Sequence, residues 1–176
     1  FASAIMLYGI SLVYAQAGAT NYAEAGRVLG GQGATAGVLL AVFLVAIGLA
    51  FKVSAAPFHM WTPDVYQGAP TPVAAFFSVG PKAAAFAAFI AAFIVAFPGT
   101  VKEWGILFIV LSIATMLVGN LYALVQTNVK RMLAFSSIAH AGYLLAGLGG
   151  AWGPWDTRGP PTRAGGCWCI WPPTRS

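Results

Sequence analysis

The chain has 176 residues, of which 59% are hydrophobic and only 7% are charged, and its mean hydropathy is +0.79. Soluble domains carry about 25% charged residues, so this composition excludes an ordinary soluble protein and indicates an all-α membrane bundle. The formal net charge of +5 does not indicate nucleic-acid binding. The basic residues form no stripe, and three of them, Arg158, Arg163 and Arg175, lie in an unusual tail.

The apolar runs predict about five transmembrane helices. A spanning helix needs about 20 apolar residues, and the first run is slightly shorter, so we expect its beginning to be missing. The chain starts inside this run without a recognisable signal peptide, and we interpret it as a fragment of a longer protein. The expected helices occupy residues 1–17, 34–61, 72–97, 102–124 and 130–149, with polar loops at 18–33 and 62–71.

The second predicted span contains a lysine followed by a helix breaker. Its apolar stretch GVLLAVFLVAIGLAF leads directly into Lys52, and Pro57 follows five residues later. Proline removes a backbone donor and clashes with the preceding turn, and a membrane tolerates such a break only against protein or water. The sequence therefore predicts a broken helix whose freed carbonyls face Lys52 or water.

The orientation in the membrane depends on one basic pair. Lys130 and Arg131 directly precede the fifth span, and basic residues beside a span favour the cytoplasmic side. Alternation then places the 62–71 loop in the cytoplasm and the loops at 18–33 and 98–103 on the opposite side.

The composition changes from about residue 150, where Pro, Arg, Trp and Cys replace the Ala-, Leu-, Val- and Phe-rich pattern. Cys167 and Cys169 form a C-x-C spacing that is too short for an ordinary zinc ribbon or thioredoxin motif. A Trp- and Pro-rich tail outside the membrane is one interpretation of residues 150–176.

A shift of reading frame is the interpretation that we favour for this tail. When the codons of residues 167–175 are read one base earlier, the likeliest bases give Leu-Val-Tyr-Leu-Ala-Ala-Tyr-Ala, an ordinary transmembrane sequence. The other shifted frame gives a Gly-, Arg- and Ser-rich string. We therefore expect a shift between Gly149 and Cys167, and a tail without native structure or function.

The segment FKVSAAPFHMWTPDVYQGAPTPVAAF closely resembles the signature of the subunit N family of the proton-pumping NADH:quinone oxidoreductase, respiratory complex I. This antiporter-like family is related to subunits of multisubunit sodium/proton antiporters. FASAIMLYGISLVYAQAG and KRMLAFSSIAHAGYLLAGL resemble the same family, so the resemblance covers about residues 1–149. The run TPDVYQGAPTP is its most specific part.

The resemblance implies a fold of about fourteen helices built from two inverted five-helix repeats, of which this chain corresponds to the sixth through tenth. It places Lys52 on the lysine of the broken seventh helix and Lys82 on the lysine of the eighth. Both are implied members of a hydrophilic axis along the membrane midplane. The fifth-helix glutamate and twelfth-helix lysine of the family have no counterpart in residues 1–149.

The implied function is proton translocation through buried lysines, driven by redox chemistry in other subunits. The implied partners are the other membrane subunits of complex I, the lipid bilayer and protons, in a multi-pass protein of the bacterial inner membrane. The chain has no cysteine cluster for iron–sulfur and no Gly-rich nucleotide fingerprint. We therefore expect no cofactor or metal site here, and expect NAD, FMN, iron–sulfur clusters and quinone on other subunits.

Lys82 lies near the middle of the third predicted span, about 5 Å from the midplane at 1.5 Å per residue. A charged lysine near the bilayer centre costs about 2.5 to 10 kcal/mol, so a lysine here is expected to exchange protons. Pro81 weakens the helix ladder beside it, and Ser78, one turn back, is the predicted hydrogen-bond partner. A lysine neutralised by an interhelical partner for packing alone is the structural alternative.

Three further residues are candidate relays. His59 lies seven residues after Lys52, on the same face if the helix continued, and histidine titrates near neutral pH. His140 lies within the fifth span with serines one turn back, and Lys130 is a candidate entrance from the cytoplasm. The structural alternatives are a helix-end histidine, a satisfied polar cluster and an interfacial anchor.

Two other functions remain open for the whole chain. A subunit of a sodium/proton antiporter or of a membrane-bound hydrogenase would share the fold, although the spelling of the TPDVYQGAPTP run favours the oxidoreductase. A purely structural membrane bundle without conduction is the third possibility.

Overall fold

The computed structural model describes residues 1–151, and every regular element within this range is helical. The predicted aberrant tail therefore lies almost entirely outside the described residues. In chain order the elements are α1 (Ala2–Ala17), α2 (Tyr22–Gln32), α3 (Ala36–Val53), α4 (Trp61–Gly68), α5 (Thr71–Ile90), the π-helical turn η1 (Ala91–Ala96), the 3₁₀ turn η2 (Pro98–Thr100), α6 (Val101–Leu124) and α7 (Val129–Ala151).

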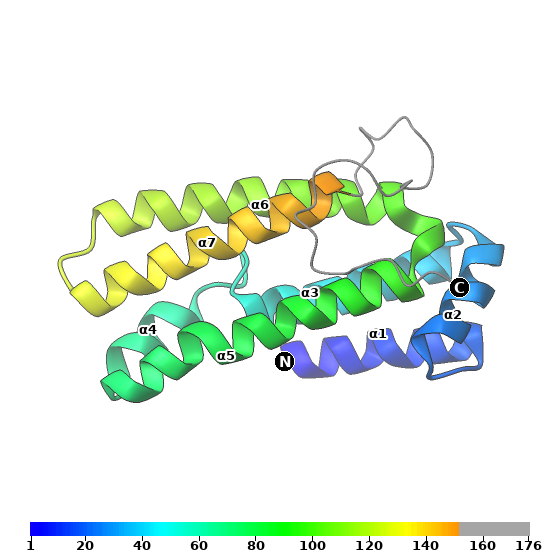
Figure 1. The fold of residues 1–176 in the computed structure, drawn as a ribbon, viewed down its shortest axis with the longest axis horizontal. Coiled ribbons are helices and arrows are strands. Elements are labelled where there is room, and N and C mark those ends of the chain that lie inside the picture. The colour runs from blue at the N-terminus through cyan, green and yellow to red at the C-terminus, as the bar shows by residue number, and fades with distance from the viewer. Residues whose placement is uncertain (152–176) are drawn as a thin grey trace, which may run out of the picture.

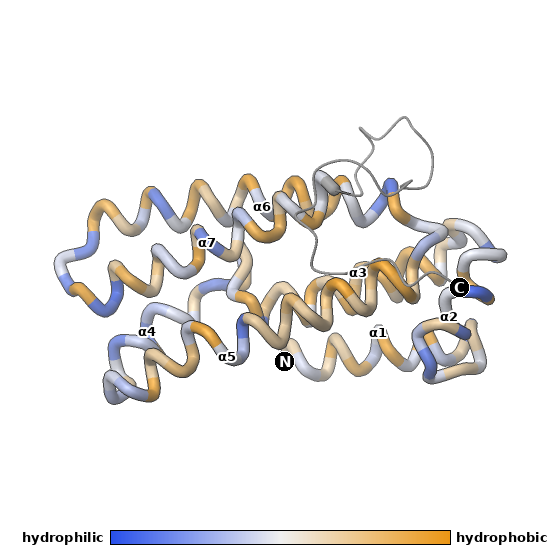
Figure 2. Tube along the Cα trace, in the orientation of Figure 1, coloured by the Kyte–Doolittle hydropathy of each residue, from blue (hydrophilic) through white to orange (hydrophobic). Residues whose placement is uncertain are grey.

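The long helices lie roughly alongside one another in an elongated bundle (Figure 1). Four segments in the described range are long and apolar enough to cross a membrane, and the bent pair of α1 and α2 would add a fifth. The four are Ala36–Val53, Thr71–Ala96, Pro98–Leu124 and Val129–Gly150. Figure 2 shows hydrophobic residues along these helices and hydrophilic ones mainly at the turns. The predicted all-α membrane fold with about five spans is confirmed.

The segment 18–33, predicted to be a polar loop, contains the helix α2. The Asn21 side chain accepts a hydrogen bond from Ala23 N at 3.0 Å, and Glu24 lies in the first turn. An asparagine cap followed three positions later by glutamate is a recognised helix start. The loop prediction was wrong because it relied on the polarity of the segment and overlooked this start signal.

The helix α2 packs against η1 and η2 at one end of the bundle. Ala25 and Leu29 are buried there, and Gly26 lies so close to η1 that a Cβ atom at this position would clash with Val95 O. The absence of a side chain at Gly26 therefore allows the two backbones to meet.

The second span, predicted to run to residue 61, ends at Val53. Ser54 adopts a left-handed conformation (φ 64°), and its N–H donates to the carbonyls of the last turn. The chain re-enters a helix at Trp61, so α4 replaces most of the predicted loop at 62–71. Pro63 fits in the first turn of α4, because the amide there needs no intrahelical acceptor.

An aromatic cluster holds α5 and η1 against α6. Phe93 packs against Phe89, Phe97, Trp104 and Phe108, and its ring centroid lies 4.8 Å from that of Phe108. The Trp104 Nε1–H donates to Phe97 O at 3.2 Å. Edge-to-face aromatic pairs add about 0.5–1.5 kcal/mol each beyond the area they bury, so this cluster is the main apolar core at its end of the bundle.

The helices α6 and α7 form a close antiparallel pair through small residues. A Cβ atom at Gly119 would lie 2.7 Å from Ala139 N, and the Ser112 hydroxyl donates to Gly142 O at 2.8 Å. Small residues let membrane helices approach closely and gain dispersion energy.

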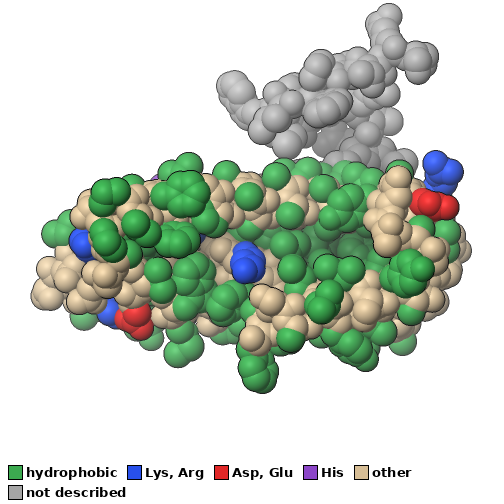
Figure 3. Space-filling view, turned by 90° about the horizontal axis from the view of Figure 1, so that it is seen from below, with side chains coloured by type: hydrophobic (Ala, Val, Ile, Leu, Met, Phe, Trp, Pro, Cys, Tyr) green, Lys and Arg blue, Asp and Glu red, His purple; other side chains and the backbone are tan. Residues whose placement is uncertain are grey.

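The bundle has two polar ends. The α4 segment and the turn between α6 and α7 lie at one end, and α2 and η2 lie at the other (Figure 1). Figure 3 shows charged side chains toward both ends of a mainly hydrophobic face, with a basic side chain near its middle. The predicted loop 62–71 and the basic pair thus share one end, as alternation requires, and its cytoplasmic placement stays a prediction.

Replacing Gly26 with alanine tests the close contact between α2 and η1. Alanine gains about 0.5–1 kcal/mol of helix stability, but the clash with Val95 O is expected to cost about 1–3 kcal/mol, so Gly26→Ala should lower the thermal unfolding midpoint. Gly31→Ala, in the same helix with no atom within 4 Å of the new methyl group, should raise it slightly. Equal midpoints for the two detergent-purified variants would contradict the close contact.

Candidate functional site

Lys82 is buried in the middle of α5 and reaches across to α7. Its Nζ atom donates to Ser137 Oγ at 2.6 Å and to Ser137 O at 3.0 Å. The prediction that Ser78 is the hydrogen-bond partner of Lys82 is wrong. The Ser78 hydroxyl donates instead to Ala75 O, three residues back in its own helix, at 2.7 Å. Serine hydroxyls commonly bond back to a carbonyl of the preceding turn.

The backbone of α5 is locally weakened at this point. Pro81 lies inside the helix, which continues through it to Ile90. Because proline has no N–H, the carbonyl of Phe77 loses its usual intrahelical donor. The hydrogen-bond ladder of the helix is thereby interrupted beside Lys82, as predicted for this proline.

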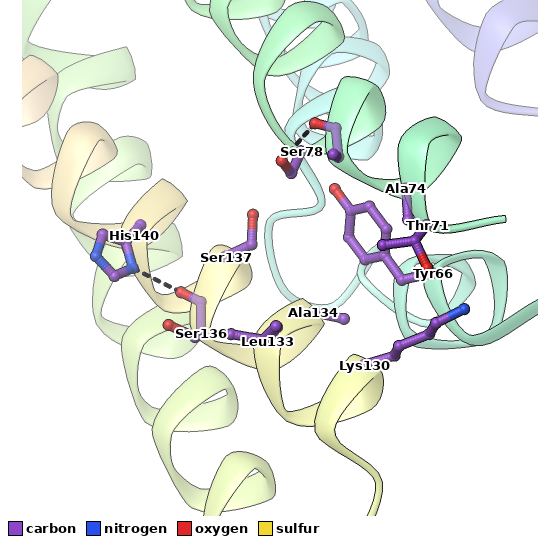
Figure 4. A pocket seen from close by; sticks show the side chains of 11 residues that line it. Tyr66, Thr71, Ala74, Ser78, Lys130, Leu133, Ala134, Ser136, Ser137 and His140 are labelled. Carbon is purple, nitrogen blue, oxygen red and sulfur yellow. Dashed lines mark hydrogen bonds between the residues drawn. The ribbon is translucent and has the colours of Figure 1, made fainter. Parts of the chain in front are cut away.

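A partly open cavity of about 550 Å³ lies between α4, α5 and α7 (Figure 4). Its polar lining includes Tyr66 from α4, Ser78 from α5, and Lys130, Ser137 and His140 from α7. Two of the five predicted site residues, Lys130 and His140, therefore line one cavity. Ser137 also lines it and binds Lys82, so a third predicted residue contacts this cavity wall.

His140 is exposed at the cavity and bonds to its own helix. Its Nδ1 lies 2.8 Å from Ser136 O, and its ring meets Tyr143 edge to face. Because a carbonyl oxygen only accepts, Nδ1 carries the proton in this contact, which leaves Nε2 for exchange. The predicted cluster of His140 with its serines is thus formed through a backbone carbonyl and not through a hydroxyl.

The basic pair at the start of α7 holds α4 in place. The Lys130 Nζ donates to Ala69 O, at the carboxyl end of α4, at 3.1 Å. Arg131 pairs with Asp64 at 2.7 Å and donates to Gln67 Oε1 at 2.9 Å. The pair that suggested a topology signal therefore also joins two helices.

Lys52 lies in the last turn of α3, directly before the break, as predicted. Its side chain is exposed on the described part of the chain, however, and does not line the cavity. The described helices cover the face of α3 that carries Leu49 and Val53 and leave position 52 uncovered. The expectation of two buried lysines thus holds for Lys82 alone within residues 1–151.

The break that follows Lys52 is held by hydroxyl groups. Thr115 of α6 accepts a hydrogen bond from Ala56 N at 2.9 Å and donates to Leu111 O. Thr62 donates to the Ser54 hydroxyl, so both sides of the break are joined. All the amides and hydroxyls named here are buried, and buried polar groups need such partners.

His59 lies in the turn between α3 and α4, and its ring lies beside the stacked rings of Tyr122 of α6 and Phe135 of α7. Its buried Nδ1 has no hydrogen-bond partner among the described residues. The helix does not continue from Lys52 to His59, so the condition under which the two would share a helix face is not met. His59 is also not part of the cavity lining.

Three residues of this region were missed as site residues. Tyr66 is buried, and its hydroxyl points into the cavity toward Ser137 (Figure 4). Ser137 lies seven residues after Lys130, on the same face of α7, and this spacing could have identified it. Thr115 has no comparable sequence signal, because its contact is with a residue 59 positions away.

Comparison with known proteins identifies the family of this chain. Residues 1–155 match the family model described as NADH:quinone oxidoreductase/Mrp antiporter, transmembrane. The chain belongs to this family. The predicted membership is therefore confirmed over most of the chain.

Individual relatives and solved structures show which members of the family this chain is similar to. A relative from Moorella thermoacetica, named NADH-quinone oxidoreductase subunit N, is 54% identical over 146 residues, which are 83% of this chain and 31% of the relative. Respiratory complex I from Thermus thermophilus matches with a TM-score of 0.67 and 45% identity over 82% of this chain and 30% of that one. The Mrp complex of a Dietzia species matches with a TM-score of 0.76 and 30% identity over 84% of this chain and 27% of that one.

The chain spans about 30% of the length of the family members it matches. The antiporter-like membrane fold is thus established for these helices, as is their similarity to subunit N. The activity of a complete family member is treated below as a proposal.

Replacing Thr115 with valine tests how the break beside Lys52 is held. Valine keeps the shape but leaves the Ala56 N–H buried without its acceptor, which is expected to cost about 1–3 kcal/mol of unfolding free energy. Thr115→Ser keeps the hydroxyl and should lose much less. Denaturant unfolding of the detergent-purified protein measures both, and equal losses would show that the hydroxyl contributes nothing.

Proposed function

We propose that these helices are part of a membrane subunit of NADH:quinone oxidoreductase that takes part in proton translocation, with Lys82 as a proton carrier. The observation that carries this proposal is the environment of Lys82. It is buried within an apolar helix, and the hydrogen bonds described for it go to two neutral oxygens of Ser137.

Neutral partners suit a lysine that changes its protonation state. A carboxylate beside Lys82 would hold the ammonium form firmly, because opposite charges within about 4–6 Å favour the charged state. A hydroxyl and a carbonyl satisfy the ammonium group without fixing its charge. A charge that moves in a neighbouring subunit then changes the proton affinity of Lys82, which couples redox work elsewhere to proton movement here.

The remaining predicted residues support this role as further relays. Lys130 and His140 line the cavity that Ser137 shares with Lys82. Lys52 lies in the last turn of α3, directly before the break between α3 and α4. His59 holds a buried ring nitrogen at the same break.

Partners and location follow from the same proposal. The chain works with the other membrane subunits of complex I in the lipid bilayer, and its relatives suggest the bacterial inner membrane. NAD, FMN, iron–sulfur clusters and quinone belong to other subunits, and this chain contributes no redox group.

A sodium/proton antiporter subunit is the second candidate. The fold does not separate the two, since the Mrp complex superposes with a TM-score of 0.76 and complex I with 0.67. Sequence identity does separate them, with 45% to complex I and 30% to the Mrp complex. The oxidoreductase is therefore the better supported function.

Lys82→Met in the intact complex tests the proposal. Methionine fills a similar volume without a proton site, so NADH-driven proton pumping, followed with a pH-sensitive dye in vesicles, should fall to a small fraction of the wild-type rate. Lys102→Met, an exposed lysine in the first turn of α6, is the matched control and should pump normally. Wild-type pumping by an assembled Lys82→Met complex would leave the helices with a structural role only.

A further inference from the structure

Ser137 stands between Lys82 and the cavity. It lines the cavity wall, whereas Lys82 is buried behind it and is not among the lining residues. Both hydrogen bonds described for Lys82 end on this one residue, at 2.6 Å to the hydroxyl and 3.0 Å to the carbonyl. Any proton that passes between Lys82 and this cavity therefore meets Ser137 first.

The two oxygens of Ser137 differ in what they can do. The carbonyl only accepts hydrogen bonds, but the hydroxyl both donates and accepts. When Lys82 is an ammonium ion, both oxygens accept from it. When Lys82 is a neutral amine, its lone pair needs a donor, and rotation about the Cβ–Oγ bond of Ser137 turns the hydroxyl proton toward it. The same residue thus serves both protonation states without backbone movement.

We propose that Ser137 is the proton-transfer residue that links Lys82 to the cavity between α4, α5 and α7, an inference that rests on the proposed function of Lys82. In the outward step, an Nζ–H bond of Lys82 breaks and a new Oγ–H bond forms on Ser137. The original hydroxyl proton of Ser137 leaves at the same time to an acceptor in the cavity. Ser137 ends chemically unchanged, Lys82 becomes neutral, and the acceptor gains one proton.

The cavity offers acceptors for the next step. The Tyr66 hydroxyl points toward Ser137 from α4 (Figure 4). His140 also lines the cavity and keeps Nε2 for exchange because Nδ1 is bound to Ser136 O, but its ring points away from Ser137 (Figure 4). A water molecule also fits, since a cavity of about 550 Å³ far exceeds the space one water requires. Lys130 lines the cavity near the polar start of α7, where it adds a positive charge to the cavity wall.

Substitutions at position 137 separate a proton-transfer role from a packing role. Ser137→Ala keeps the carbonyl and removes the hydroxyl, and a lost hydrogen bond to a charged group is expected to slow proton pumping about 10- to 100-fold. Ser137→Thr retains the hydroxyl and should restore pumping to near the wild-type rate. A residue needed only for close packing would tolerate alanine better than the larger threonine, so the opposite order overturns the proposal.

Two neighbouring serines provide matched controls. Ser136→Ala removes the hydroxyl group at the position directly before Ser137 in α7. Ser78→Ala removes a hydroxyl group that donates its hydrogen bond within its own helix, α5. Both variants should pump at near the wild-type rate. A loss as large as that of Ser137→Ala in either control would show that the effect is not specific to Ser137 and would overturn the assignment.

The measurement is NADH-driven proton pumping per assembled complex, with the amount of complex determined on native gels. Lys82→Met distinguishes the two levels of the argument. If Lys82→Met pumps normally, the proposed function fails, whereas if it stops pumping and Ser137→Ala does not, only the role of Ser137 fails. Should Ser137→Ala not assemble, Ser137→Cys carries the test: its weaker donor should slow pumping, and a wild-type rate would overturn the proposal.

Discussion

The hydrogen bonds from Lys82 to Ser137 are the interaction on which the arrangement of this site depends. A lysine in the middle of an apolar helix has to find polar partners, because an uncompensated charge in hydrocarbon is costly. In this chain the partners lie on α7, 55 residues further along. The need to satisfy one ammonium group therefore fixes the relative position of α5 and α7 and places the cavity wall between them.

The helix α7 organises the surrounding elements. Lys130 and Arg131 at its start bind α4, Ser137 binds α5, and small residues in its second half pack against α6. The Arg131–Asp64 pair is partly exposed, and such pairs are individually worth about 0–1 kcal/mol. Its significance is geometric, because together with Lys130 it sets where α4 and its Tyr66 stand relative to the cavity.

Much of the fold could be predicted from hydrophobicity, and the failures have identifiable physical causes. The long spans are mostly apolar, so α1, α6 and α7 begin and end close to the predicted positions, and α5 does so together with η1. The short helices α2 and α4 were missed because they are polar and owe their existence to the Asn21 cap and to contacts with other elements. Local polarity alone cannot reveal such tertiary support.

Lys82, Lys130 and His140 of the candidate site were predicted from the sequence, but Tyr66 and Ser137 and the contacts between these residues were not. Lys82 had to be either neutralised or partnered, and that much follows from its position in a span. Ser78 was a reasonable partner by helical spacing, but its hydroxyl bonds a carbonyl of its own helix and leaves Lys82 to Ser137. Contacts between distant segments, such as Thr115 with Ala56, carry no local pattern and become visible only in three dimensions.

The two polar features of the site share one rigid support. The break after Lys52 is held by Thr115 of α6, and Lys82 is held by Ser137 of α7. The α6–α7 pair between them is joined by backbone contacts at Gly119 and by the bond from Ser112 to Gly142 O. Since packed helices of this kind do not deform continuously, a proton can move on either side without the pair shifting. Rotation of hydroxyl groups is then the least costly motion with which this part of the bundle can respond to a change of charge.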